Sequence, residues 1–288
     1  MVYCFYPWSV AAGAVGRFVL RCPVVLDLED VSVPRLEDWK QGTRARPVQQ
    51  LSGWMGMKAL LALSDAVVVP TKRFLRFVPT GKRVEVVSGC MDARPLAHEG
   101  ECGVLHVLFA GKVEREHGSA VLAEALKALD ASPAGPRFRF DVCGGGKGLE
   151  ELRAAAGALA HVSVAVHGFV DDIEYRRLLA RADIALAIQD PSGRYSDLKT
   201  PSKAYEFMAS GKAVVVSDVG DLAELPNETR HLLTPYSGEA LAGLLASMTA
   251  DSVVETGAAA LRHAKNHWGI GENGRKILAL FRRALETR

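Results

Sequence analysis

The sequence predicts an α/β protein built from doubly wound parallel sheets. The clearest support is the stretch from Ala182 to Gly220, in which an apolar run (Ile184–Ile188) is followed by a polar loop, a helix and a second apolar run (Ala213–Val216). Neither run alternates with polar residues, as expected for strands of a parallel sheet that is covered on both faces. The helix is predicted to begin at residues 200–202, where a Ser or Thr cap stands beside a Pro, and to end at Gly211.

Strand and helix signals alternate through residues 1–95, which favours a parallel sheet with crossover helices. In chain order, the sequence predicts strands at 2–8, 23–30, 64–71 and 83–89, and helices at Ala11–Leu20, 47–63 and Lys72–Phe77.

The same alternation continues after a polar, glycine-containing linker at 93–103. Strands are predicted at 104–111, 137–146 and 161–168, before the two of the Ala182–Gly220 stretch, and helices at Ser119–Leu129, Leu149–Leu159, Asp172–Arg181, Gly238–Thr249, Ser252–His267 and Glu272–Thr287. A chain of 288 residues is long enough for two domains. We expect a first domain at 1–98, a second at 99–268, and a terminal helix within 269–288 that packs back on the first domain.

Composition excludes several classes of protein. The chain carries 35 basic and 33 acidic residues, and a net charge of +2 offers no electrostatic basis for binding nucleic acid. Five scattered cysteines without a C-x-x-C pair are typical of reduced thiols in the cytoplasm. The apolar start of the chain lacks a basic leading segment, contains Pro7 and is interrupted by Arg17, so we interpret it as interior structure and not as a signal or a membrane span.

The start of the helix at residue 202 is the first candidate site. Ligands of parallel sheets bind at the carboxyl ends of the strands, where the N-termini of helices offer free N–H groups to anions. Pro201 and Ser202 stand at this start, and Lys203 and Glu206 follow within the first two turns. Lys203 is expected to face a phosphate, and Glu206 to accept hydrogen bonds from sugar hydroxyls.

The stretch Pro201-x-Lys203-x-x-Glu206, followed by Met208-Ala209-x-Gly211, resembles the nucleotide-sugar motif of GT-B glycosyltransferases of the retaining family-4 type. Further similar stretches are 108–112 with 117–118, 142–146 and 167–170, and the resemblance covers about the whole chain. Three positions depart from the family pattern. The first of the family's two glutamates falls on Leu198, its diphosphate-binding Arg on Lys112, and its following Lys on His117.

The resemblance implies two Rossmann-like domains, of which the amino-terminal one is incomplete, because the opening strand and glycine-rich loop of the family have no match here. The chain therefore resembles an amino-terminally truncated member. The implied activity is retaining, metal-independent transfer of a hexose from a UDP- or GDP-sugar to a glycan or lipid-linked acceptor, as in polysaccharide biosynthesis, with no cofactor.

The resemblance also implies roles for individual residues. Lys112, Lys203 and His117 would bind the diphosphate, Glu206 the ribose, and the backbone of Val170 the base, while Gly111 and Gly145 belong to the matching strand ends. Glu29 and Asp30 end a strand of the first domain, where they would orient an acceptor hydroxyl. The candidate catalytic residues are thus Lys112, Glu206, Glu29 and Asp30, with no metal ligand among them.

Alternatives remain open. The departures at Leu198 and His117 also fit a non-catalytic or partner-dependent nucleotide-sugar-binding subunit, with a partner chain completing the first domain. A nucleotide-sugar epimerase ranks last, because no residue is identified for proton transfer. The basic and aromatic segment 71–82 leaves open a peripheral contact at the inner face of a membrane.

Overall fold

The computed structural model describes residues 1–5, 9–29, 45–96, 103–132, 137–193 and 195–286, with side chains from residue 50 onward in the helix that begins at Ala45. The chain forms two compact units. The first unit comprises Met1–Cys90 together with Ile270–Arg288, and the second unit comprises Met91–Gly269.

The first unit is built on a four-stranded parallel sheet of order β1-β2-β3-β4. Its strands are β1 (Val2–Phe5), β2 (Val24–Asp27), β3 (Ala66–Val69) and β4 (Arg83–Val86), and its helices are α1 (Val10–Ala14), continued by a wider turn at Val15–Val19, α3 (Ala45–Leu63), a 3-10 helix at Lys72–Phe77, and α10 (Ile270–Leu285).

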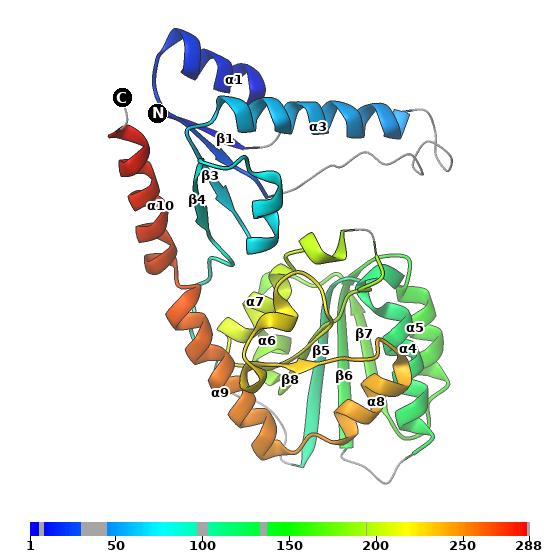
Figure 1. The fold of residues 1–288 in the computed structure, drawn as a ribbon. Helices are drawn as coiled ribbons and strands as arrows, with labels where there is room; N and C mark the ends of the chain where they lie inside the picture. Colours follow the sequence, from blue (N-terminus) through cyan, green and yellow to red (C-terminus); the bar gives the residue numbers. More distant parts are fainter. Residues whose placement is uncertain (6–8, 30–44, 97–102, 133–136, 194, 287–288) are drawn as a thin grey trace. The chain divides into compact units, whose positions relative to one another are not determined.

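Helix α10 belongs to the first unit although it ends the chain (Figure 1). Its Leu280 and Ala284 are buried against Val25, Ala66 and Val68 of the sheet. An ion pair of 3.1 Å joins Arg283 to Glu85 of β4, so both apolar packing and charge hold the terminal helix on these strands.

The second unit is built on a six-stranded parallel sheet of order β10-β9-β8-β5-β6-β7. Its strands are β5 (Val104–Lys112), β6 (Arg137–Gly145), β7 (Ser163–Gly168), β8 (Ile184–Ala187), β9 (Ala213–Val216) and β10 (His231–Leu232). The first strand, β5, lies in the middle, the next two lie on one side of it and the last three on the other. This is the doubly wound strand order of dinucleotide-binding folds, and it reverses direction between β5 and β8.

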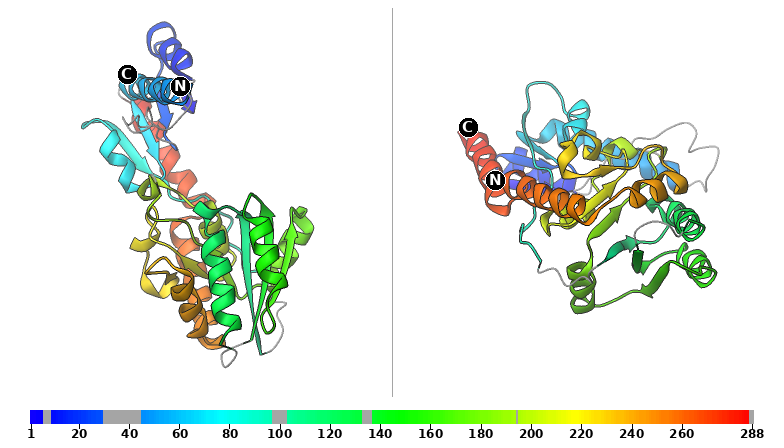
Figure 2. Two further views of the ribbon diagram at one scale, coloured as in Figure 1. Left: turned by 90° about the vertical axis from the view of Figure 1, so that its right-hand side faces the viewer. Right: turned by 90° about the horizontal axis from the view of Figure 1, so that it is seen from below.

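Helices cover both faces of the six-stranded sheet (Figures 1 and 2). One face packs against α4 (Ser119–Asp130), α5 (Leu149–Gly157) and α8 (Gly238–Ala246), and the other against α6 (Asp172–Arg181), α7 (Ser202–Ala209) and α9 (Ala250–His267). Both β8 and β9 are buried along their whole length, which explains why their sequences are apolar without alternation.

The prediction of an α/β fold with two parallel sheets is confirmed, and the predicted strands and helices recur within a few residues. Two details were wrong. Helix α7 starts at Ser202 as expected, but Pro201 occupies the capping position, and no side chain accepts a hydrogen bond there. The two-residue strand β10 was missed, because His231–Leu232 is too short to form a recognisable apolar run.

No helix within the described residues is both long and apolar enough to cross a membrane. In the basic segment 71–82, Phe74 is buried, and the ring of Phe77 packs edge-on against Trp54 at 6.3 Å between centroids. These two rings therefore contribute to the first unit's own packing. All four cysteines in the described part of the chain are free thiols, two of them buried.

Candidate functional site

A pocket of about 300 Å³ opens in the second unit at the carboxyl ends of β5 and β8. It therefore lies where the strand order reverses, the position at which doubly wound sheets bind their ligands. The chain reaches it in three places: the end of β5 with His117, the end of β8 with the two residues after it, and the start of α7. These segments supply Phe109–Lys112, His117, Leu186–Gln189 and Thr200–Lys203.

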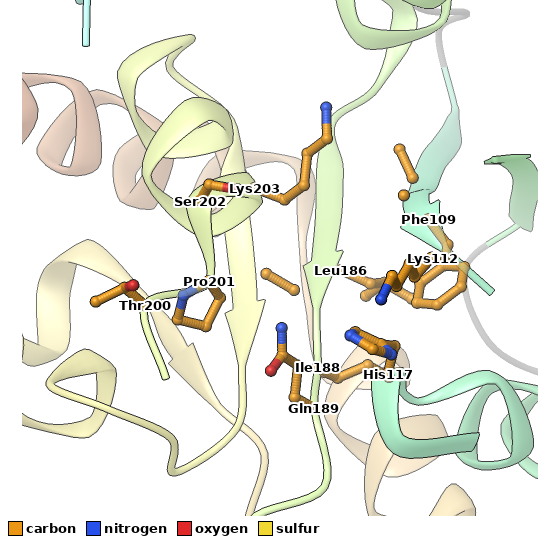
Figure 3. A pocket seen from close by; sticks show the side chains of 13 residues that line it. Phe109, Lys112, His117, Leu186, Ile188, Gln189, Thr200, Pro201, Ser202 and Lys203 are labelled. Carbon is orange, nitrogen blue, oxygen red and sulfur yellow. The ribbon is translucent and has the colours of Figure 1, made fainter. Parts of the chain in front are cut away.

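Lys112 and His117 lie on one side of the pocket, and Thr200 and Pro201 lie on the opposite side (Figure 3). Gln189 extends its carboxamide into the space between them. The start of α7 contributes unpaired backbone N–H groups as well as side chains, because the first turn of any helix has no intrahelical acceptor for them. The pocket thus presents the Lys112 ammonium, the His117 imidazole and N–H donors around a small volume, an arrangement suited to a polyanion.

Charges of both signs lie near His117. Burial lowers the pKa of His117 below its ordinary value of 6.5, and the cations Lys199 and Lys112 lower it further, while Glu116 and Glu114 oppose them. Lys199 is thus a second cation, besides Lys112, near the His117 imidazole, although it does not line the pocket itself. His117 is consequently neutral at pH 7 in the free protein, and an anion bound beside it would favour its protonated form.

The backbone of Gln189 is hydrogen-bonded to the buried hydroxyl of Ser217. The backbone N–H of Gln189 donates to Ser217 Oγ at 2.8 Å, and Ser217 Oγ donates back to the Gln189 carbonyl at 2.5 Å. Ser217 follows β9 and is fully buried. The end of β8 is therefore tied to the end of β9, and the carboxamide of Gln189 is presented from a rigid position.

Lys203 lines the pocket, but its side chain points away from Lys112 and His117 (Figure 3). Its ammonium donates to Glu206 Oε2 at 2.8 Å and to the hydroxyl of Tyr175 at 2.9 Å. The Tyr175 hydroxyl in turn donates to Glu206 Oε1 at 2.8 Å. We call this closed set of three hydrogen bonds, formed between α6 and α7, the Tyr175–Lys203–Glu206 triangle.

Two glycines allow β5 and β6 to approach each other at the edge of the pocket. Gly111 and Gly144 are paired in register, and both have a φ of +125°, a backbone angle that residues other than glycine rarely adopt. A Cβ atom on Gly144 would lie 1.8 Å from the carbonyl oxygen of Gly111. A side chain at residue 144 would therefore force these two strands apart.

The pocket brings together six of the residues predicted from the sequence to bind a donor. They are Gly111, Lys112, His117, Pro201, Ser202 and Lys203. Three others lie outside its lining. Glu206 does not line the pocket but accepts a hydrogen bond from Lys203, which does. Gly145 lies against the ring of Phe169, and Val170 packs against the core of the second unit.

The predicted acceptor-side residues are in the first unit. Glu29 is exposed two residues beyond β2, and Asp30 lies outside the described residues. In the second unit, the position of the family's first glutamate is taken by Leu198, which is buried in a 3-10 helix at Ser196–Leu198. An apolar side chain suits this buried position, whereas an unpaired carboxylate there would be costly.

Sequence reasoning did not single out Gln189, Lys199 or Tyr175. Gln189 could have been found, because it is the first polar residue after the apolar run of β8. Tyr175 carries no local signal, since its two partners lie 28 and 31 residues away on another helix. Its role is visible only once α6 and α7 are placed side by side.

One group of possible metal ligands is present in the described part of the chain. Donor atoms of Glu114, Glu116 and His117 all lie within 4.8 Å of one another. The sequence predicted no metal ligand, and His117 was considered only as a phosphate contact. Glu116 is exposed, and its carboxylate lies 3.6 Å from His117 Nδ1, a contact that becomes a loose ion pair only when His117 is protonated.

Residues 105–251 match the protein family described as glycosyl transferases, group 1. No curated protein matches this chain. Among solved structures, the sucrose-phosphate synthase of Thermosynechococcus elongatus is 18% identical with a TM-score of 0.69, over 99% of this chain and 74% of that one. HepE of Anabaena, in complex with UDP and glucose, is 17% identical with a TM-score of 0.69, over 98% and 78%. A glycosyltransferase of Rickettsia africae is 15% identical with a TM-score of 0.61, over 99% and 98%. These likenesses show a shared GT-B fold.

Proposed function

This chain belongs to the group 1 glycosyl transferases, and we propose that its second unit binds the nucleoside diphosphate of a UDP- or GDP-sugar. The observation that carries the proposal is the pocket at the strand-order reversal, lined by Lys112, His117 and the start of α7. The structure of HepE with UDP and glucose favours a UDP-sugar as the first candidate.

In this proposal the leaving diphosphate is stabilised by the chain's own charges. Lys112, with His117 once it is protonated, faces the phosphates together with the N–H groups of α7, and Lys199 adds a positive charge near His117. Preorganised positive charge of this kind stabilises the negative charge that develops as the glycosidic bond breaks. We therefore propose metal-independent transfer with retention at the anomeric carbon, of a hexose, to a glycan or lipid-linked acceptor.

Glu206 is proposed to bind the ribose of the donor. A carboxylate offers about four lone-pair positions, and the triangle uses two of them, so two remain for hydroxyl donors. Hydrogen bonds to a charged group contribute about 1.5–3 kcal/mol each. Loss of two such bonds would weaken binding by at least about 100-fold.

The test is calorimetric titration of the chain with UDP, GDP and ADP, in the presence and absence of a chelator. We expect one nucleotide to bind, and Glu206→Ala to weaken that binding by at least about 100-fold. Glu239→Ala, which removes an exposed glutamate from the first turn of α8, is the matched control and should bind as the wild type does. Failure of a folded sample to bind any of the three nucleotides would overturn the proposal.

Two further results decide the finer points. Binding that the chelator abolishes would contradict metal independence and would direct attention to Glu114, Glu116 and His117. In a separate incubation with the sugar nucleotide of the base that binds, binding without release of sugar and without transfer to any acceptor would favour the non-catalytic subunit, to which the buried Leu198 also points.

His117 predicts a pH dependence of donor binding. Its pKa is lowered in the free protein, and a bound diphosphate would raise it, so binding takes up a proton. Affinity should therefore increase as the pH falls from 8 to about 6.5, within the range where the imidazole of the complex becomes protonated. Titrations at several pH values check this, and His117→Gln should flatten the profile. An equally steep profile in the variant would assign the proton to another group, such as the phosphate.

A further inference from the structure

In the Tyr175–Lys203–Glu206 triangle, the side chains of Lys203 and Glu206 are held more firmly than an ion pair on one helix would hold them. Lys203 and Glu206 are three residues apart on one helix, and both are about one-third exposed, with side-chain exposures of 36% and 33%. An isolated pair of this kind contributes only about 0.2–0.5 kcal/mol. Such a weak pair would leave both side chains free to change rotamer, so it does not by itself fix the carboxylate.

Tyr175 adds the constraint from a second helix. Its hydroxyl donates to Glu206 Oε1 at 2.8 Å and accepts from Lys203 Nζ at 2.9 Å. The same ammonium lies 4.1 Å from the centre of the Tyr175 ring, a distance typical of a cation–π contact. One side chain of α6 thus holds both members of the ion pair on α7.

The protonation state of Tyr175 makes the direction of these bonds certain. Burial raises the pKa of Tyr175 well above its ordinary value of 10, and the negative charge of Glu206 and the hydrogen bond to it raise it further. The hydroxyl therefore keeps its proton at every physiological pH. Because its one proton is directed at Glu206, the oxygen is left to accept from Lys203.

The triangle leaves a defined set of acceptor positions on Glu206. Tyr175 takes one lone pair on Oε1, and Lys203 takes one on Oε2. One acceptor position remains on each oxygen. Two acceptors on the two oxygens of a single carboxylate match two hydroxyls on neighbouring carbons, which is the arrangement of a ribose and not of a 2′-deoxyribose.

We propose that Tyr175 is a positioning residue that orients Glu206 toward the vicinal diol of the donor's ribose, and so selects ribonucleotides over 2′-deoxyribonucleotides. The inference rests on the proposed function of the same site. Tyr175 acts through Glu206 and does not itself contact the donor in this scheme.

The test compares UDP with 2′-deoxyuridine diphosphate as ligands of the whole chain. Tyr175→Phe removes one oxygen and keeps the ring, whose contacts with the core of the second unit are apolar. The wild type should prefer UDP by about 10-fold or more, the difference expected from one hydrogen bond to a charged group. The variant should lose most of this preference by weakening UDP about 10-fold more than the deoxy compound, which has only the bond from its 3′-hydroxyl to Glu206 to lose.

Tyr236→Phe is the matched control. The hydroxyl of Tyr236 is buried and has no hydrogen-bond partner among the residues that the structure describes. This variant makes the same chemical change in the same unit without breaking a bond of the triangle. Its preference for UDP over the deoxy compound should equal that of the wild type.

The outcomes separate the inference from the function on which it rests. A wild type that binds neither compound overturns the proposed function and the inference together. A wild type that binds both equally overturns the role of Glu206 toward the diol. If the wild type prefers UDP and a folded Tyr175→Phe keeps that preference, the donor site stands and the positioning role of Tyr175 is wrong.

Discussion

Replacing Gly144 with alanine is expected to lower the free energy of unfolding of the second unit by more than about 4 kcal/mol, or to prevent its folding. The added Cβ would lie 1.8 Å from the carbonyl oxygen and 2.8 Å from the carbonyl carbon of Gly111. Both atoms belong to the backbone of the neighbouring strand, so no side-chain rotation relieves the overlap. Separating β5 from β6 at this point would break the sheet beside the pocket.

Gly111→Ala is the control for the backbone conformation alone. Gly111 has the same φ of +125°, but the nearest atom to an added Cβ is Lys203 Cγ at an ordinary 3.8 Å. We expect a cost of about 1–3 kcal/mol there, the strain of the unusual φ. Denaturant unfolding followed by circular dichroism gives both values. Equal losses in the two variants would contradict the close approach of the strands.

Replacing His106 with leucine is expected to stabilise the second unit by about 1–3 kcal/mol at pH 8, the range associated with a buried polar group that lacks a partner. His106 lies within β5 with 2% of its surface exposed, and neither ring nitrogen has a hydrogen-bond partner among the described residues. Leucine has nearly the same volume and no polar atom, so the site should accept it without a cavity.

The gain in stability of His106→Leu over the wild type should be larger in acid. Burial lowers the pKa of His106 below 6.5, and the nearby cations Arg181 and Arg139 add to this effect, against Asp183 and Asp141. Below pH 6.5 the unfolded chain binds a proton at this residue that the folded chain does not, so stability falls as the pH falls. The slope for one such group is about 1.4 kcal/mol per pH unit, down to the folded-state pKa. His106→Leu should remove this component from the acid dependence.

His106→Gln separates the two effects. The amide does not titrate but remains polar, so this variant should lose the acid component without the gain at pH 8. Unfolding curves at pH 8 and pH 5.5 measure both quantities. His231 and His263 also have lowered pKa values because of burial, and some acid sensitivity should therefore persist. An acid dependence in both His106 variants identical to that of the wild type would contradict the prediction.

The family motif on α7 was accessible from the sequence because its chemistry is local. Pro201, Lys203 and Glu206 stand within two turns of one helix. The ion pair between Lys203 and Glu206 was not predicted, although their spacing permits it. The capping residue was predicted wrongly, because several neighbouring residues fit the same local pattern. Ser202 and Thr200 both suit a helix start, and only the backbone conformation places Pro201 at that position.

The positions of Gly145 and Val170 show a second limit. Gly145 ends β6 and Val170 follows β7, at the same edge of the sheet as Lys112. A sequence pattern can place a residue at this edge but cannot place it further. The lateral distance between strands at the edge depends on strand order. The pocket forms between β5 and β8, whereas β6, which ends at Gly145, and β7, which precedes Val170, lie on the other side of β5.

The sequence by itself determined the class of fold and most of its strands and helices, and it supplied the cationic and carboxylate residues proposed to bind a diphosphate and a sugar. These features depend on runs and spacings within about ten residues, which the local chain geometry converts directly into structure. Only the tertiary structure decided that Lys112, His117, Gln189 and Pro201 enclose one pocket, and that Tyr175 holds Lys203 and Glu206. The physical reason is that side chains far apart in the sequence meet through the order of the strands and the packing of α6 against α7, and no local pattern encodes either.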